Sequence, residues 1–268
     1  MIKIKNMADK AEIFLYGIIV DDTDANWIKQ NDDGTIGYQY PAEIKAQLDA
    51  LKGIPITVHV ASDGGNIAAG IAIFNMLKNH DAPVDIYVDS WAASIASFIC
   101  FAGRKVYMPE NTFMMIHNPS GGGFGEAEYL RSIADWLDKL KNMIADTYAN
   151  HSKKSIDEIK ALMDKETWLS AKEASELFDI VELTASNEIQ AVAEYKSSFK
   201  NAPKNLLPKS EEEIEAENKA KAEAEAKAKA EADAKAKEEA EAKEKAVNEI
   251  KNKISLVLME AYKYEKEG

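Results

Sequence analysis

The alternation of strand-like and helix-like segments in the first half of the chain constrains the fold more than any other feature of the sequence. Residues 12–20 and 54–60 are apolar, β-branched and aromatic runs of strand length, and a third such run begins at Val84. Amphipathic segments with helical spacing follow the first two runs. Strands that alternate with helices build a mainly parallel sheet, whose functional site lies at the carboxyl ends of its strands. The sequence therefore predicts an α/β fold with its site at that edge.

The expected helices are defined by apolar residues three or four positions apart. Pro41 opens the first helix, and a second one follows the Gly64–Gly65 pair. The spacing of apolar residues within 126–150 predicts a long amphipathic helix, and a shorter helix is expected to begin at Ser155. The remaining expected elements are a polar loop at residues 21–39, a strand at 113–116, and a short helix and last strand within 171–184.

Ser94 has the sequence context of a nucleophile on a tight strand-to-helix turn. It follows the apolar run from Val84, and the small residues Ala92 and Ala93 leave room for a close backbone approach. A nearly all-apolar segment comes next, and a helix beginning there supplies free N–H groups and the positive end of its dipole. Ser94 is therefore the candidate nucleophile.

His117 is the candidate base among the four histidines of the sequence. It directly follows the expected strand 113–116, and a serine and a histidine on neighbouring strand ends can form a base-activated nucleophile. His59 lies within an apolar run and is expected to pack in the core. His80 and His151 lie among polar residues near helix ends.

The Gly64–Gly65 pair has two interpretations. Paired glycines are common in ordinary tight turns. They also let the backbone direct an N–H group into a cleft with no Cβ in the way, and together with the N–H of Ile95 such a group would form an oxyanion hole. The position of the pair before a candidate nucleophile favours the second interpretation.

Three motifs, in this order along the chain, resemble those of the ClpP-type serine peptidases. They are the SDGGN loop, the AAS pattern that ends at Ser94, and the run MPENTFMMIHNPSGG. The resemblance covers about residues 11–185 and is strongest to the branch encoded in phage genomes as head-maturation (prohead) proteases. It implies a ClpP/crotonase-like fold, a repeated β-β-α spiral with a long handle helix, and protein or peptide substrates.

The resemblance also implies roles for single residues. Ser94 would be the nucleophile and His117 the base, and the N–H groups of Gly65 and Ile95 would form the oxyanion hole. Where this chain has Asp63, the family often has proline, a departure that affects loop rigidity rather than chemistry.

Two further roles concern the segment after His117. Gly122, Gly123 and Phe124 would form a strand beside bound substrate. The helix at 126–150 would be the handle through which two rings of a homo-oligomer meet.

The third catalytic group departs from the family pattern. An aspartate three residues before the position of Leu169 orients the histidine in the family, and here that position is Glu166. A carboxylate is needed there to hold the imidazole tautomer and to stabilise the imidazolium. Glu166 is favoured, with Asp164 as the alternative acid.

Composition narrows the choice of partners. A net charge of −13 argues against nucleic acid and anionic membranes, because phosphate binding needs clustered Lys and Arg. The sequence shows no apolar signal region and no apolar run of membrane-spanning length, which predicts a cytoplasmic protein, in the host cytoplasm if phage-encoded. We expect no metal and no cofactor, because no typical ligand spacing occurs. The single cysteine, Cys100, is expected to pack as a small apolar residue.

The chain changes character after about residue 185. Residues 1–200 are expected to form the protease domain, and residues 201–268 a helical or partly disordered tail. Residues 209–249 are almost entirely Ala, Glu and Lys, which bury no core. An apolar stripe returns near the end and indicates either helix-end packing or a docking or scaffold segment; it consists of Ile250, Ile254, Val257, Leu258 and Ala261.

The functional prediction is a serine endopeptidase that processes phage capsid or scaffold proteins. The chain carries no G-x-x-x-x-G-K-[ST] motif, so ATP-driven unfolding would require a separate partner. Two alternatives belong to other classes. One is a crotonase-like acyl-CoA enzyme, and the other is an assembly or scaffold protein on an inactive protease fold.

Overall fold

The computed structural model describes residues 5–7, 10–31, 37–186 and 201. The chain divides into two units, Met1–Leu207 and Pro208–Gly268, and all described residues belong to the first. The predicted domain boundary at residue 200, and the predictions for the tail beyond Asn201, lie outside the described residues.

A mainly parallel sheet forms the centre of the described unit. Three long strands are parallel neighbours in the order β2, β4 and β5, and β6 and β9 extend the sheet beyond β5. The strands of this layer are β1 (Lys5–Met7), β2 (Lys10–Ile19), β3 (Tyr38–Gln39), β4 (Ile56–Gly65), β5 (Val84–Ala93), β6 (Val106–Pro109) and β9 (Val181–Thr184). The mixed α/β fold predicted from the sequence is confirmed.

The sheet divides along β5, and this division positions the site. The first half of β5 pairs with β6, whereas its last three residues pair in parallel with β7 (Phe113–Ile116). Strand β7 in turn pairs antiparallel with β8 (Thr167–Ser170). The end of β5, the end of β7 and the start of β8 therefore lie at one edge.

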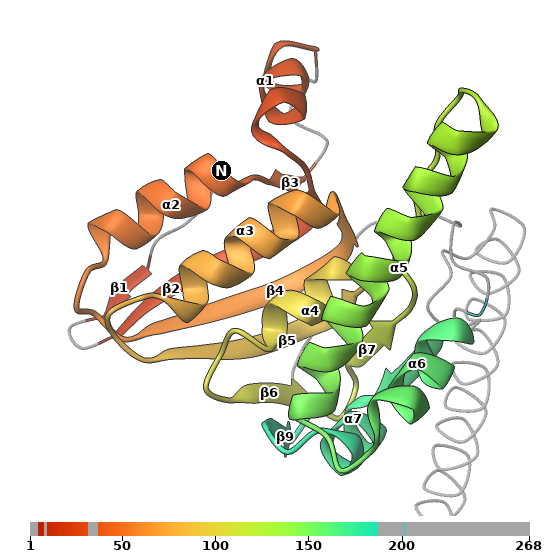
Figure 1. Cartoon of the computed structure of the whole chain (residues 1–268). Helices are drawn as coiled ribbons and strands as arrows, with labels where there is room; N and C mark the ends of the chain where they lie inside the picture. Colours follow the sequence, from red (N-terminus) through yellow and green to blue (C-terminus); the bar gives the residue numbers. More distant parts are fainter. Residues whose placement is uncertain (1–4, 8–9, 32–36, 187–200, 202–268) are drawn as a thin grey trace, which may run out of the picture. The chain divides into compact units, whose positions relative to one another are not determined.

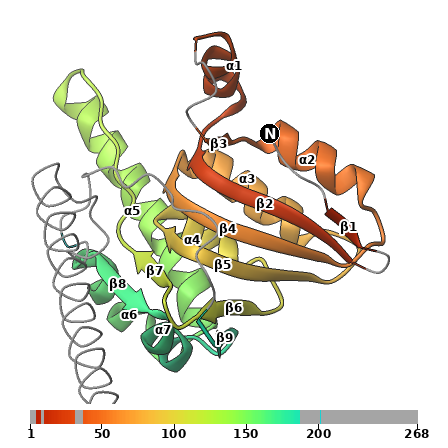
Figure 2. The same ribbon diagram turned by 180° about the vertical axis from the view of Figure 1, so that it is seen from behind.

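The helices pack on the sheet in a way that leaves one face without a described helix. Figure 1 shows α2 and α3 lying across one face, with α4 and α5 beside them, whereas no described helix crosses β2, β4 and β5 in the opposite view of Figure 2. The helices are α1 (Asp22–Asn31), α2 (Pro41–Ala50), α3 (Ile67–Lys78), α4 (Ile95–Cys100), α5 (Ala127–Asn150), α6 (Ile156–Asp164) and α7 (Ala171–Leu177).

An aromatic cluster joins α4, α5 and α7. Tyr148 of α5 lies 5.1 Å from Phe101 and 6.0 Å from Phe178 between ring centroids, and it also contacts Phe98 edge-on at 6.5 Å. All four rings are buried. Large buried rings contribute strongly to core stability, so this cluster anchors the carboxyl-terminal part of α5 against α4.

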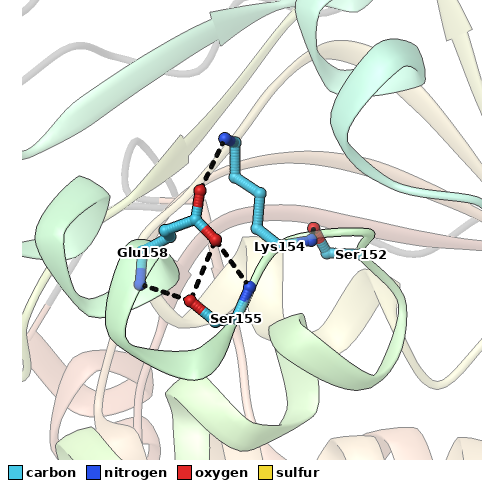
Figure 3. A network of polar contacts seen from close by, with 4 residues as sticks. All are labelled: Ser152, Lys154, Ser155 and Glu158. Atoms are coloured by element: carbon cyan, nitrogen blue, oxygen red, sulfur yellow. Dashed lines mark hydrogen bonds and ion pairs between the residues drawn. The ribbon is translucent and has the colours of Figure 1, made fainter.

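The start of α6 is fixed by a capping box. Figure 3 shows the Ser155 hydroxyl accepting from the backbone N–H of Glu158, while the Glu158 carboxylate accepts from the backbone N–H of Ser155 at 2.9 Å. Lys154 adds an ion pair to the same carboxylate. Because each bond satisfies a backbone donor of the first turn, the box sets where α6 begins, as its serine predicted.

Three sequence predictions need correction. The expected loop at residues 21–39 contains α1 and β3, because the Asp21 side chain accepts from the first N–H groups of α1, and Ala25 and Ile28 pack against Val20. Strands β4 and β5 run on to Gly65 and Ala93, further than their apolar runs. Residues 122–124 form no strand in the described part of the chain, where no neighbouring strand pairs with them.

Candidate active site

Ser94 lies between β5 and α4 in a sparsely populated backbone conformation. Its φ is 57° and its ψ is −131°, and its N–H donates to the carbonyl of Met115 in β7. Non-glycine residues keep such a conformation only where the surroundings determine it, and these positions cluster at functional sites. The turn that the sequence indicated is present, and it separates the serine from the regular strand.

The turn requires a glycine on its neighbouring strand. A Cβ added at Gly64 would lie 2.7 Å from the Cβ of Ser94 and 3.1 Å from the N of Ile95, and Gly64 has a φ of +89°. Gly65, with a φ of +143°, lies against the backbone of Ile19 instead. The close approach to Ser94 is therefore made by the first glycine of the pair.

His117 directly follows β7 and faces the serine. Its Nε2 lies 2.7 Å from Ser94 Oγ, within hydrogen-bonding distance. Burial lowers the pKa of His117 below the ordinary 6.5, and the negative charge of Glu166 opposes this shift. The lowered pKa keeps the imidazole neutral near pH 7, which is the form that can accept the serine proton.

Glu166 lies in the turn between α6 and β8, with a φ of 48°. Its charge acts on His117, and its Oε1 accepts from the backbone N–H of Asn201 at 2.7 Å. The Asn201 side chain donates to the carbonyl of Lys165 in the same turn. The structure thus brings Glu166 to the site, close enough for its charge to act on His117.

Asp164, the alternative acid, is held by other groups. Its carboxylate accepts from Lys141 of α5 and from Asn118 at 2.8 Å, and these bonds, the one from Lys141 most, lower the pKa of Asp164. A carboxylate that is bound to a lysine and an amide is less suited to orienting the histidine. Through these two bonds, Asp164 links the segment after His117 to α5.

These residues line a common cavity of about 590 Å³. Its polar wall contains the predicted residues, and its apolar wall comes from α4, α5 and α6. The lining includes Gly64, Gly65, Ser94, Ile95, His117, Asp164, Glu166, Phe98, Ile144, Tyr148, Met163 and Asn201. Gly122, Gly123 and Phe124 are exposed and are not in this lining.

Several supporting residues were not found from the sequence. Ser97 donates to the carbonyl of Ser94, and Tyr148 contacts Ser97. The indole of Trp91 donates to Asp63 at the cavity wall. The contacts of Ser97 with Tyr148 and of Trp91 with Asp63 join residues far apart in the chain, and no local pattern marks them. Among the residues described here, no group of three or more possible metal ligands occurs, and no helix is long and apolar enough to cross a membrane.

The fold and the site together define a class of protein. A serine on a strained strand-to-helix turn, with a histidine nitrogen at 2.7 Å on the neighbouring strand end, is the arrangement of α/β serine hydrolases. The family model for Clp protease matches residues 34–182, which is more than half of the chain. The chain belongs to the Clp protease family, the family of ClpP-type serine peptidases.

Individual relatives agree with this assignment. The chain is 30% identical over 134 residues to an ATP-dependent Clp protease proteolytic subunit from Pleurastrum terricola, covering 49% of this chain and 67% of that protein. It is 33% identical over 133 residues to the protein of the same name from Bacteroides fragilis, covering 48% of this chain and 64% of the relative. The matched segment thus spans about two thirds of each relative.

A solved structure supports the fold. A single-residue mutant of ClpP1 from Listeria monocytogenes superposes with a TM-score of 0.53, covering 65% of this chain and 91% of that one. The sequence identity is 24%, so this likeness concerns the fold alone.

Proposed function

We propose that this protein is a serine endopeptidase that cleaves peptide bonds through Ser94, His117 and Glu166. The observation that carries the proposal is the distance of 2.7 Å between Ser94 Oγ and His117 Nε2, two residues that line the same cavity. Membership of the Clp protease family supports it.

Each residue has a defined chemical role in this proposal. His117 takes the hydroxyl proton as Ser94 Oγ attacks the peptide carbonyl, and then gives that proton to the leaving amine. The Glu166 charge stabilises the imidazolium that forms between these two steps, which agrees with its effect on the pKa of His117. Water then hydrolyses the acyl-enzyme with His117 again acting as base.

The N–H groups of Gly65 and Ile95 are proposed to hold the oxyanion. Both residues line the cavity beside Ser94, and the absence of a side chain at Gly64 leaves the N–H of Ile95 accessible to it. One donor of this kind typically contributes about 3 kcal/mol to transition-state stabilisation. Gly122, Gly123 and Phe124 are proposed to pair with extended substrate, since their segment follows His117 and is exposed.

The finer biological role rests on the resemblance to phage head-maturation proteases. We propose that the substrates are capsid or scaffold proteins in the cytoplasm of a host cell, and that cleavage needs no ATP. The lack of a phosphate-binding loop motif in the sequence supports the last point for this chain.

We also propose that the protein works as a homo-oligomeric ring. Helix α5 supports this, because it carries large exposed apolar side chains, which usually mark an interaction surface. These residues are Tyr129, Leu130, Trp136 and Met143.

A turnover assay tests the proposed function against its alternatives. The wild-type protein and Ser94→Ala are incubated with casein, with a fluorogenic peptide library and with acyl-CoA thioesters. A peptidase cleaves peptides and loses this activity in Ser94→Ala. Thioester turnover that survives in Ser94→Ala would favour the crotonase-like alternative. Self-association with no turnover at all would favour the inactive assembly protein.

A further inference from the structure

A chain of buried hydroxyl groups runs behind Ser94, from α5 to the first peptide group of α4. The Ser97 hydroxyl donates to the carbonyl oxygen of Ser94 at 2.6 Å and lies 2.9 Å from the hydroxyl of Tyr148. Ser97 is 0% exposed and Tyr148 is 1% exposed. Water therefore does not compete for these bonds, and in a buried setting each bond constrains its partners strongly.

The direction of the chain follows from the chemistry of its members. A carbonyl oxygen only accepts, so Ser97 uses its single hydroxyl hydrogen on Ser94. Tyr148 must then donate its own hydrogen to Ser97 Oγ. Burial raises the pKa of Tyr148 above its ordinary value, so the phenol keeps this hydrogen throughout the pH range in which His117 titrates.

The bonded carbonyl belongs to the same peptide group as the proposed oxyanion donor. A trans peptide group is planar, and its C=O and N–H point in opposite directions. Holding the oxygen of Ser94 therefore also sets the direction of the N–H of Ile95. The backbone N–H groups of Ser97 and Phe98 also bond this oxygen, at 3.0 and 3.5 Å, and the hydroxyl supplies a third and shorter constraint.

The position of the Tyr148 hydroxyl is itself fixed by packing. The ring packs in the aromatic cluster with Phe101 and Phe178, and this packing holds its hydroxyl beside Ser97. Helices α4 and α5 lie side by side in both views (Figures 1 and 2). The hydroxyl chain therefore ties the nucleophile turn to α5.

We infer that Ser97 and Tyr148 are positioning residues that orient the N–H of Ile95 toward the oxyanion. The inference rests on the proposed peptidase function and adds residues that touch no substrate atom. It predicts a defect in the transition state, with substrate binding and the proton chemistry of His117 left intact.

Three variants test this inference in the full-length protein: Ser97→Ala, Tyr148→Phe and the double variant. Each single change should lower kcat about tenfold, less than the loss of the oxyanion donor itself, with KM within a factor of two. A peptide aldehyde forms a hemiacetal with the serine, and its oxygen occupies the oxyanion position. The inhibition constant of this aldehyde should rise by the same factor by which kcat falls. The acid limb of the kcat/KM profile should stay in place.

The double variant separates a connected chain from two independent contacts. Because Tyr148 acts only through Ser97, the double variant should lose no more than Ser97→Ala alone. Ser175→Ala is the matched control for serine, since Ser175 makes the same bond to the carbonyl three residues earlier but lies on α7, where it is only partly buried. Tyr107→Phe in β6 is the control for the loss of a phenol hydroxyl, and thermal unfolding confirms that every variant is folded.

The outcomes distinguish this inference from the proposed function. Three outcomes would overturn the positioning role of the hydroxyl chain while leaving the proposed peptidase function in place. These are a kcat for Tyr148→Phe equal to that of an active wild type, an effect confined to KM, and losses in kcat that add up in the double variant. A wild-type protein without Ser94-dependent turnover would overturn the proposed function, and the inference with it.

Discussion

At the scale of single residues, the site depends on what is absent as much as on what is present. Ser94 can occupy its turn because Gly64 has no side chain at the point of closest approach. His117 is a candidate base because burial lowers its pKa and so favours the neutral imidazole. The charge of Glu166 opposes that shift. The sequence identified Ser94 and His117 through local patterns, whereas Ser97 and Tyr148 lie 51 positions apart and only the fold joins them.

Replacement of Gly64 tests the close approach. In Gly64→Ala the new Cβ would lie 2.7 Å from the Cβ of Ser94, so we expect peptidase activity to fall about a hundredfold. Gly53→Ala is the matched control, because Gly53 also has a positive φ, of +72°, but nothing within 4 Å of an added Cβ. Both variants should lose stability, by about 1 kcal/mol or more. Equal activity in the two would contradict the account.

The pH dependence of activity identifies the third residue. Because His117 must be neutral to act as base and its pKa is lowered, kcat/KM should rise with pH through a midpoint below 6.5. Removing the Glu166 charge removes a contribution that raises this pKa, so Glu166→Gln should move the midpoint to still lower pH. It should also lower kcat by about a hundredfold or more.

Asp164→Asn is the paired variant for this experiment. Asp164 is bound by Lys141 and Asn118, so its replacement should leave the midpoint of the acid limb in place. A shift in Asp164→Asn with none in Glu166→Gln would exchange the roles of the two carboxylates.

At the scale of elements, apolar periodicity predicted most of the architecture. The strand at 113–116, the helix opened by Pro41, the helix at 126–150 and the helix after Ser155 agree with the structure, because each has a clear pattern or capping residue. Helix α1 was missed, since it is mostly polar and rests on a small cluster around Ala25 and Ile28. Strand β8 was missed because a run of four residues gives no usable period.

Helix α5 carries the element-scale prediction. Trp136 lies on the apolar side of α5 and is 59% exposed, and we expect this side of the helix to contact another copy of the chain. Trp136→Glu should lower the oligomeric mass measured by light scattering after size-exclusion chromatography. Asn142→Glu adds the same charge to an exposed position on the opposite side of the helix and should leave the mass unchanged. An unchanged mass for Trp136→Glu would remove α5 from the interface.

At the scale of the whole molecule, a protease fold is joined to a segment of very different composition. The match to the Clp protease family ends at residue 182, and residues 209–249 consist almost entirely of Ala, Glu and Lys. The described unit contains the site residues and the cavity between them. Catalysis and docking to capsid or scaffold proteins are therefore expected to depend on different parts of the chain.

Deletion of residues 208–268 tests this separation. We expect the shortened protein to keep its peptidase activity per subunit, because the site residues lie in the first unit. Its assembly with capsid or scaffold proteins should change if the final apolar stripe is a docking segment. Sedimentation of the full-length and shortened proteins measures the effect, and identical assembly would remove the docking role from the tail.

The most direct test of the central claim is labelling with a fluorophosphonate probe, which reacts with an activated serine hydroxyl. Wild type, Ser94→Ala and His117→Ala are compared under identical conditions, with heat-unfolded wild type as the blank. The account predicts rapid labelling of the wild type and the loss of labelling in both variants, since the 2.7 Å contact joins nucleophile and base. Labelling that persists in Ser94→Ala, or a folded wild type that does not react, would contradict it.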